Sequence, residues 1–358
     1  MAKKPLLPPA NKKLLDRIKN LISPPLLRGG REGSAKDSHR LMAKITAPFV
    51  WGVGFVESWW RVVLIGLFLL IFLYYPLGGL IINNINRDTN VDIRHRDGAA
   101  LSSIDAMAYI IDSEVNVNFW TPNLPFFFPS YFLDNMPNYQ LGKIAALAKF
   151  SQGLDNRINK SRDPDLSQAA ELLQYSGTIW LFSPDSRMMP VPSASNQYRR
   201  ARKRLLKFNE HLENGTDVFI PQPDDLAYLL QITEADLAKS ITTLENQIRE
   251  NATSWIDFKA DDAFYYAQGK THSYYLIFKA LGYDYKDIIV ARNLYPAWIK
   301  MLKALEDGSA LAPWMVRNGE LNAAFSANHL NYLAFYNLKA AHQMHQLAEQ
   351  LTETLSAR

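Results

Sequence analysis

The stretch that decides the fold is VVLIGLFLLIFLYYPLGGLII, residues 62–82, which contains no charged side chain. An α-helix rises about 1.5 Å per residue, so this stretch would extend about 31 Å, close to the roughly 30 Å hydrocarbon core of a bilayer. Trp59 and Trp60 precede it and Tyr74 lies toward its other end, as is typical of aromatic residues at membrane interfaces. We therefore predict one transmembrane helix over 62–82.

Charge is distributed unevenly on the two sides of this stretch. Residues 1–44 contain eleven Lys or Arg and three acidic residues, a net charge of +8, whereas residues 62–358 contain 27 basic and 31 acidic residues, a net charge of −4. Basic residues beside a span favour the cytoplasmic side. We predict a single-pass protein of the bacterial inner membrane, with 1–44 in the cytoplasm, 83–358 as a periplasmic domain, and the span kept as an uncleaved signal anchor.

The cytoplasmic segment contains an expected amphipathic helix at residues 11–22, NKKLLDRIKNLI. We expect its cations to contact anionic headgroups of the inner leaflet, and the alternative is docking of the helix on a cytoplasmic partner. These cations are Lys12, Lys13, Arg17 and Lys19. Residues 45–61 are predicted to form an interfacial segment, in which 49–60 either stays at the interface or enters the bilayer.

Beyond the span, apolar residues recur every three or four positions, which indicates helices. Gly215 is an expected helix stop, and Pro296 an expected kink or break. The expected helices cover residues 102–115, 139–159, 163–175, 196–214, 224–248, 261–281, 285–306 and 326–355. Only residues 178–182 and 217–220 resemble strands. The predicted fold class is mainly α, with an all-helical extracytoplasmic domain packed as an up-and-down bundle or an irregular orthogonal array.

Composition excludes several classes of protein. Of the 358 residues, 48% are apolar or aromatic and 21% are charged, which excludes an intrinsically disordered chain. The sequence has no cysteine, so it has no disulfide, thiolate nucleophile or Cys-ligated metal. A search for GxSxG and SxxK nucleophiles and for paired catalytic carboxylates finds none with useful context. We expect no cofactor and favour a non-enzymatic protein.

Residues 119–137 interleave aromatic side chains with four prolines. The prolines prevent a regular helix, and so many aromatic rings are unfavourable in a freely solvated loop. Three arrangements remain open: packing under the helical domain, insertion among the outer-leaflet headgroups, or a groove that binds a partner or lipid. The candidate partner- or lipid-binding residues are Trp120, Phe126, Phe127, Phe128, Tyr131 and Phe132.

Residues 199–204, RRARKR, place five cations in a predicted helix. A translocated domain does not meet nucleic acid, so we expect no nucleic-acid partner and assign anionic lipid or lipopolysaccharide headgroups as the functional interpretation. The residues for this contact are Arg199, Arg200 and Arg202. Five consecutive positions cannot share one helix face, and the competing interpretation is a solvated face whose cations pair with Glu210, Glu213 or other carboxylates of the domain.

The weakest candidate is a metal site on the last predicted helix. His342, His345 and Glu349 have the i, i+3, i+7 spacing that zinc or iron accepts in helical bundles. A second helix would have to supply a further ligand, and the sequence has no HExxH motif. Histidine is also common in surface helices rich in Gln and Glu, so we predict no metal site.

Four stretches carry a family resemblance. They are WTPNLPFFFPSYFLDNMPNYQLG at 120–142, YYPLGG at 74–79, WLF at 180–182 and YRRARKRLLKFN at 198–209. Together they resemble a proteobacterial family of single-span inner-membrane proteins known as a domain of unknown function. The resemblance implies the topology and the bacterial inner membrane, and it implies no activity, cofactor or catalytic residue.

The leading functional prediction is a bitopic inner-membrane protein whose periplasmic helical domain is a binding scaffold, an accessory or assembly factor of the cell envelope. Its expected partners are the lipid bilayer and another envelope protein, and any self-association should come from the helical domain. The alternative is an envelope enzyme, or a lipid- or lipopolysaccharide-handling protein, with its site near 119–137. A deep pocket with convergent polar groups there favours the alternative, and a flat aromatic surface favours binding.

Overall fold

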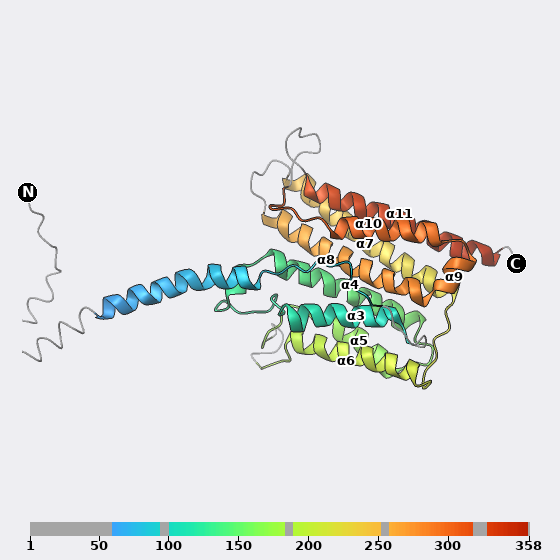
Figure 1. The fold of residues 1–358 in the computed structure, drawn as a ribbon, viewed down its shortest axis with the longest axis horizontal. Helices are drawn as coiled ribbons and strands as arrows, with labels where there is room; N and C mark the ends of the chain where they lie inside the picture. Colours follow the sequence, from blue (N-terminus) through green and yellow to red (C-terminus); the bar gives the residue numbers. More distant parts are fainter. Residues whose placement is uncertain (1–58, 94–99, 183–188, 252–257, 318–327, 357–358) are drawn as a thin grey trace, which may run out of the picture. The chain divides into compact units, whose positions relative to one another are not determined.

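The computed structural model describes residues 59–93, 100–182, 189–251, 258–317 and 328–356 (Figure 1). The predicted helix at 11–22, with its four cations, and most of the interfacial segment lie outside these residues. By its contacts the chain divides into two compact units, Met1–Leu70 and Ile71–Arg358. The boundary between the units falls within an apolar helix.

That apolar helix is Trp59–Ile82. Among the described residues, it is the one helix that is long and apolar enough to cross a membrane. It includes the predicted span and begins three residues earlier. Nearly all of its side chains are exposed. Exposing an apolar surface of this length to water is unfavourable, and the length and composition of the helix suit the hydrocarbon core of a bilayer.

The second unit is helical, which confirms the predicted fold class. Its elements are α3 (Ser102–Asp112), the π-helical η1 (Ser113–Val117), the 3-10 helix η2 (Pro129–Phe132), α4 (Asn135–Arg157), α5 (Pro164–Leu173), α6 (Ala194–Glu213), α7 (Pro223–Asn251), α8 (Phe258–Asp284), α9 (Lys286–Ala291), α10 (Tyr295–Ser309) and α11 (His329–Ser356). The expected break near Pro296 is confirmed, because α9 ends at Ala291 and Pro296 lies in the first turn of α10.

The long helices lie alongside one another as a bundle (Figure 1). Helix α7 packs along α11, α4 packs along α8, and α5 packs along α6. Helix α3 contacts both α6 and α8, and α10 contacts both α8 and α11. The expected helix at 224–248 is confirmed as α7, and its buried residues recur every three or four positions: Leu226, Leu230, Thr233, Leu237, Ile241, Leu244 and Ile248.

The expectation of two short strands is wrong. The described part of the chain contains no strand, and Phe182 forms only an isolated antiparallel bridge with Pro190. Residues 217–220 lie in the connection between α6 and α7. The apolar side chains Val218 and Ile220 are exposed there, so their alternation with polar residues does not mark a buried sheet face.

Helices α4 and α8 approach closely because each presents a glycine to the other. A Cβ at Gly142 would collide with the backbone carbonyl of Tyr266, and a Cβ at Gly269 would collide with that of Tyr139. Backbone atoms cannot move aside as a flexible side chain can. This glycine pair therefore fixes the spacing of the two helices that form the centre of the bundle.

An extended strap, residues 83–93, leads from the apolar helix into the bundle. The carbonyl of Asn86 accepts a hydrogen bond from Lys143 Nζ at 3.1 Å, and the carbonyl of Asp88 lies 3.1 Å from His272 Nε2. A carbonyl only accepts, so Nε2 carries the proton. Desolvation lowers the pKa of His272 well below its usual value, which keeps the ring neutral. Polar side chains of α4 and α8 thus hold the strap.

Candidate membrane-interface site

The loop at 119–137 is attached to the C-terminal turns of the apolar helix. The Tyr74 hydroxyl donates to the Phe127 carbonyl at 3.1 Å, and the Tyr75 hydroxyl donates to the Phe126 carbonyl at 3.0 Å. Gly78 leaves the space that the Pro129 ring occupies, since a Cβ on Gly78 would collide with that ring. Two hydroxyl groups and one close contact therefore fix the loop backbone against the helix.

Several rings at the tip of this loop are exposed. Phe126 is 67% exposed and Phe132 is 70% exposed. We call the exposed rings the aromatic patch, which consists of Phe126, Phe127, Tyr131, Phe132 and Trp180. The Phe126 and Phe127 ring centroids are 5.5 Å apart, and the Tyr131 and Phe132 centroids are also 5.5 Å apart, each pair edge to face. The patch is a set of projecting rings on a fixed backbone.

Trp180 is a member of the patch that the sequence did not single out as a site residue. Its ring centroid is 5.9 Å from that of Phe127, although 53 positions separate the two in the chain. The available signal was the WLF motif at 180–182, which in the structure leaves all three side chains exposed. Three consecutive exposed apolar residues are the kind of surface that a water-soluble domain avoids.

Trp120 is not part of the exposed surface, contrary to its assignment as a binding residue. It is 3% exposed, its Nε1 donates to the Gly177 carbonyl at 2.8 Å, and its ring contacts Tyr198 edge to face. Phe128 is half-buried. The loop therefore has a buried root at Trp120, which packs under the helical domain, and an exposed tip at the aromatic patch.

The position of the patch along the apolar helix is set by its contacts. Tyr74 lies eight residues before Ile82, the last residue of the helix, which corresponds to about 12 Å of helix. The loop thus meets the helix about two turns before the helix ends.

The cations at 199–204 are mostly engaged with neighbouring side chains and backbone. Arg199 Nε donates to Asn116 at 2.8 Å, and Arg202 Nε is 3.3 Å from Asp112. Arg204 and Lys207 both pair with Asp165. Arg200 is exposed and donates to Gln197. Of the five cations at 199–204, Arg202 and Arg204 pair with carboxylates of other helices, as the solvated-face interpretation expects.

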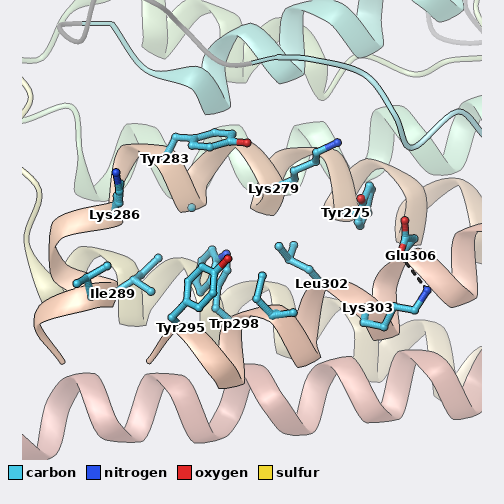
Figure 2. Close-up of a pocket in the computed structure, with 13 residues that line it drawn as sticks. Tyr275, Lys279, Tyr283, Lys286, Ile289, Tyr295, Trp298, Leu302, Lys303 and Glu306 are labelled. Carbon is cyan, nitrogen blue, oxygen red and sulfur yellow. Dashed lines mark hydrogen bonds and ion pairs between the residues drawn. The ribbon is translucent and has the colours of Figure 1, made fainter. Parts of the chain in front are cut away.

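Two pockets lie elsewhere in the bundle, and neither is lined by a residue of 119–137. A groove of about 470 Å³ lies between α8 and α10, with α9 at one end (Figure 2). A second pocket, of about 600 Å³, lies beside Asp284 at the end of α8. The exposed rings of the loop therefore form a surface rather than the wall of either pocket.

The structure brings together only part of the metal candidate of the sequence. His345 lies between Glu234 and Glu349, 3.2 Å from each, and His342 is exposed. Among the described residues, three ligand atoms that all lie within 4.8 Å of one another are supplied by Asp163, Asp165 and His211. The sequence did not single out this cluster, because α5 and α6 supply its members from distant positions.

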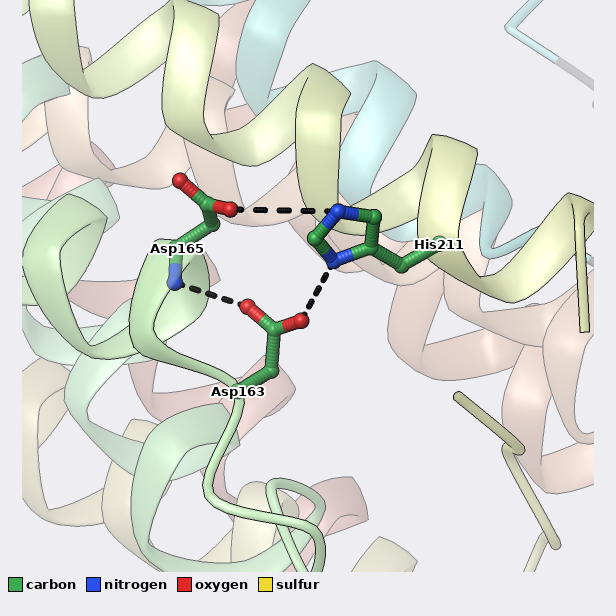
Figure 3. Close-up of side chains that lie close together, drawn as sticks. All are labelled: Asp163, Asp165 and His211. Atoms are coloured by element: carbon green, nitrogen blue, oxygen red, sulfur yellow. Dashed lines mark hydrogen bonds and ion pairs between the residues drawn. The ribbon is translucent and has the colours of Figure 1, made fainter. Parts of the chain in front are cut away.

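The Asp163–Asp165–His211 cluster is a joint between α5 and α6 (Figure 3). Asp163 caps α5 through the Asp165 backbone N–H at 2.7 Å and lies 2.5 Å from His211 Nδ1. Burial would raise the pKa of Asp165, but hydrogen bonds and charge from Lys207 and Arg204 leave it below its usual value. Those two cations already neutralise Asp165 and would oppose a bound metal ion.

These observations define a mainly helical protein with one candidate transmembrane helix and an aromatic surface at the end of that helix. The chain belongs to the family of uncharacterized proteins conserved in bacteria, DUF2333, whose model matches residues 123–251 and 229–353. The matched region includes the exposed tip of the loop and helices α4 to α11. No curated protein and no solved structure matches the chain.

Proposed function

We propose that this protein is a bitopic protein of the bacterial inner membrane. In this proposal its N-terminal segment is cytoplasmic, and its helical domain is a periplasmic scaffold that lies against the outer leaflet and binds another envelope protein. The observation that carries the proposal is the attachment of the loop to Tyr74 and Tyr75, which fixes the aromatic patch beside the last turns of an exposed apolar helix. The basic excess of residues 1–44 supports the orientation.

The membrane contact predicts that the aromatic patch lies below the headgroups. The chain has no cysteine, so Phe126→Cys and Phe132→Cys each provide one spin-labelling position. In full-length protein reconstituted into lipid nanodiscs, we expect labels at both positions to collide more often with oxygen than with a water-soluble nickel chelate, because oxygen partitions into the hydrocarbon. Electron paramagnetic resonance power saturation measures the two collision rates.

The matched control is Ile220→Cys, an exposed apolar position in the connection between α6 and α7. Its label should collide more often with the nickel chelate. If the labels at Phe126 and Phe132 match the Ile220 control, the aromatic patch faces water and the membrane-contact proposal is wrong. Labelling of the Ile220→Cys variant in intact cells with a membrane-impermeant maleimide tests the orientation, since a periplasmic domain reacts and a cytoplasmic one does not.

The surface proposed for an envelope protein is the outer face of α11. Tyr332, Phe335 and Leu338 follow one another at three-residue spacing, and each is more than half exposed. Exposed apolar residues gathered on one helix face are typical of protein-binding surfaces. A scaffold held at the membrane by its aromatic patch leaves this second surface available.

A photoreactive residue placed at Phe335 is expected to yield a discrete crosslinked product with a second protein in intact cells. The matched control places the same residue at Glu210, an exposed position on α6, and should give no such product. Denaturing electrophoresis and mass spectrometry identify the product. A product that contains two copies of this chain, or equal products at both positions, contradicts the assignment of α11 to another envelope protein.

A further inference from the structure

The groove between α8 and α10 is apolar along most of its length (Figure 2). Its apolar lining consists of Ile289, Val290, Trp298, Ile299 and Leu302. Gly282 makes room for the Trp298 indole, since a Cβ at this glycine would lie 2.7 Å from Nε1. The volume of about 470 Å³ is within the range of small-molecule sites.

Two lysines give one side of the groove a positive charge. Lys279 Nζ donates to the carbonyls of Thr89 at 2.9 Å and Val91 at 3.3 Å, which are neutral and leave its charge in place. Lys286 is exposed at the start of α9. Neither lysine forms an ion pair with a carboxylate among the residues that the structure describes.

At the other end of the groove one lysine faces two carboxylates. Lys303 pairs with Glu306 at 3.1 Å and with Asp307 at 2.9 Å. Desolvation, followed by the charge of Glu306, raises the pKa of Tyr275 to about 12, so this hydroxyl stays neutral. The groove therefore has the exposed Lys286 at one end and a lysine with two carboxylates at the other, joined by an apolar lining.

We propose that this groove binds an anionic amphiphile, with its negative group beside Lys286 and its apolar chain along Trp298 and Leu302 toward Lys279. An ammonium group without a carboxylate partner favours an anion, and an indole and aliphatic lining favours a hydrocarbon chain. A fatty-acid carboxylate and a lysophospholipid phosphate share this chemistry. The proposal does not depend on the aromatic patch, which lies on other elements.

The test uses full-length protein in nanodiscs of zwitterionic lipid and three photoactivatable probes with the same diazirine-bearing chain. The probes are a fatty acid, a lysophosphatidylglycerol and the uncharged alcohol. Peptide mass spectrometry locates the adducts. We expect the fatty acid, the phospholipid or both to label peptides of α8 to α10 at least about tenfold more strongly than the alcohol, because only they provide a charge-assisted contact. The stronger of the two identifies the source of the anion.

Two variants with matched controls complete the test. Val290→Trp fills the groove from an exposed position and should abolish the labelling of α8 to α10, whereas Ile220→Trp should not change it. Lys286→Gln should weaken labelling by the anionic probes several-fold, and the exposed Lys300→Gln should not. Equal labelling by the alcohol, or unchanged labelling of Val290→Trp, overturns the proposal. Spin-label accessibility at Phe126 is expected to stay the same in every variant, which separates this result from the membrane-contact proposal.

Discussion

Replacing Lys143 with methionine is expected to lower the free energy of unfolding of the helical domain by about 3–5 kcal/mol. Lys143 Nζ is 2.6 Å from Glu114 Oε1, and the two side chains are only 2% and 1% exposed. Methionine fills similar space but removes the positive charge. The variant would leave the Glu114 carboxylate buried without a counter-ion, and this desolvated charge is the source of the cost.

The same substitution also weakens the attachment of the strap. Lys143 donates to the Asn86 carbonyl as well as to Glu114, so one side chain joins α4, η1 and residues 83–93. Desolvation lowers the pKa of Lys143, while the charge and hydrogen bond of Glu114 act in the opposite direction. The pair is therefore interdependent, and removing either partner alone is worse than removing both.

Urea unfolding of the full-length protein in nanodiscs, followed by tryptophan fluorescence, measures this loss. The matched control is the double variant Lys143→Met/Glu114→Gln, which leaves no buried charge and should recover most of the lost stability. A single variant as stable as wild type would show that Glu114 finds water or another partner. A double variant no better than the single one would assign the loss to packing or to the Asn86 contact.

The helices could be predicted from the sequence because their apolar periodicity reports burial directly. The start of α4 shows where local signals mislead. Asn138 is a good N-cap by type, yet Asp134 caps the helix four residues earlier, and Pro137 fits into the first turn, where no backbone N–H donor is needed. For α3, Ser102 and Ser103 are candidate caps by type, but Leu101 occupies the N-cap position.

The site could be predicted only in part, because exposure is a tertiary property. Composition identifies the aromatic residues of 119–137 but does not show which of them are buried. The Trp120 indole donates a hydrogen bond to a buried carbonyl, whereas the Phe126 side chain has no polar atom and is exposed. The contacts of Lys143 with Glu114 and of Arg204 with Asp165 join residues 29 and 39 positions apart. Single-sequence spacing carries no signal for pairs of that kind.

A large pH effect on stability is expected from Asp284. Its carboxylate accepts the Ser102 backbone N–H at 2.7 Å and the Ser103 backbone N–H at 2.9 Å, so a residue of α8 supplies the cap that α3 lacks. Desolvation nevertheless raises the pKa of Asp284 to about 6, against the lowering effect of these hydrogen bonds. The folded protein therefore holds the proton of this carboxyl more tightly than the unfolded chain does.

The sign of the effect follows from that difference. The contribution of the raised pKa to stability is complete below about pH 4 and is lost as the pH rises through about 6, a change of roughly 3 kcal/mol for a shift of about two pKa units. Asp284→Asn removes the titration while keeping one acceptor oxygen. We expect the free energy of unfolding of wild type minus that of the variant to fall by that amount between pH 4 and pH 7. Urea unfolding of both full-length proteins in nanodiscs measures this difference. Parallel pH profiles would mean that Asp284 is solvated in the folded state and that the α3 cap does not depend on its charge.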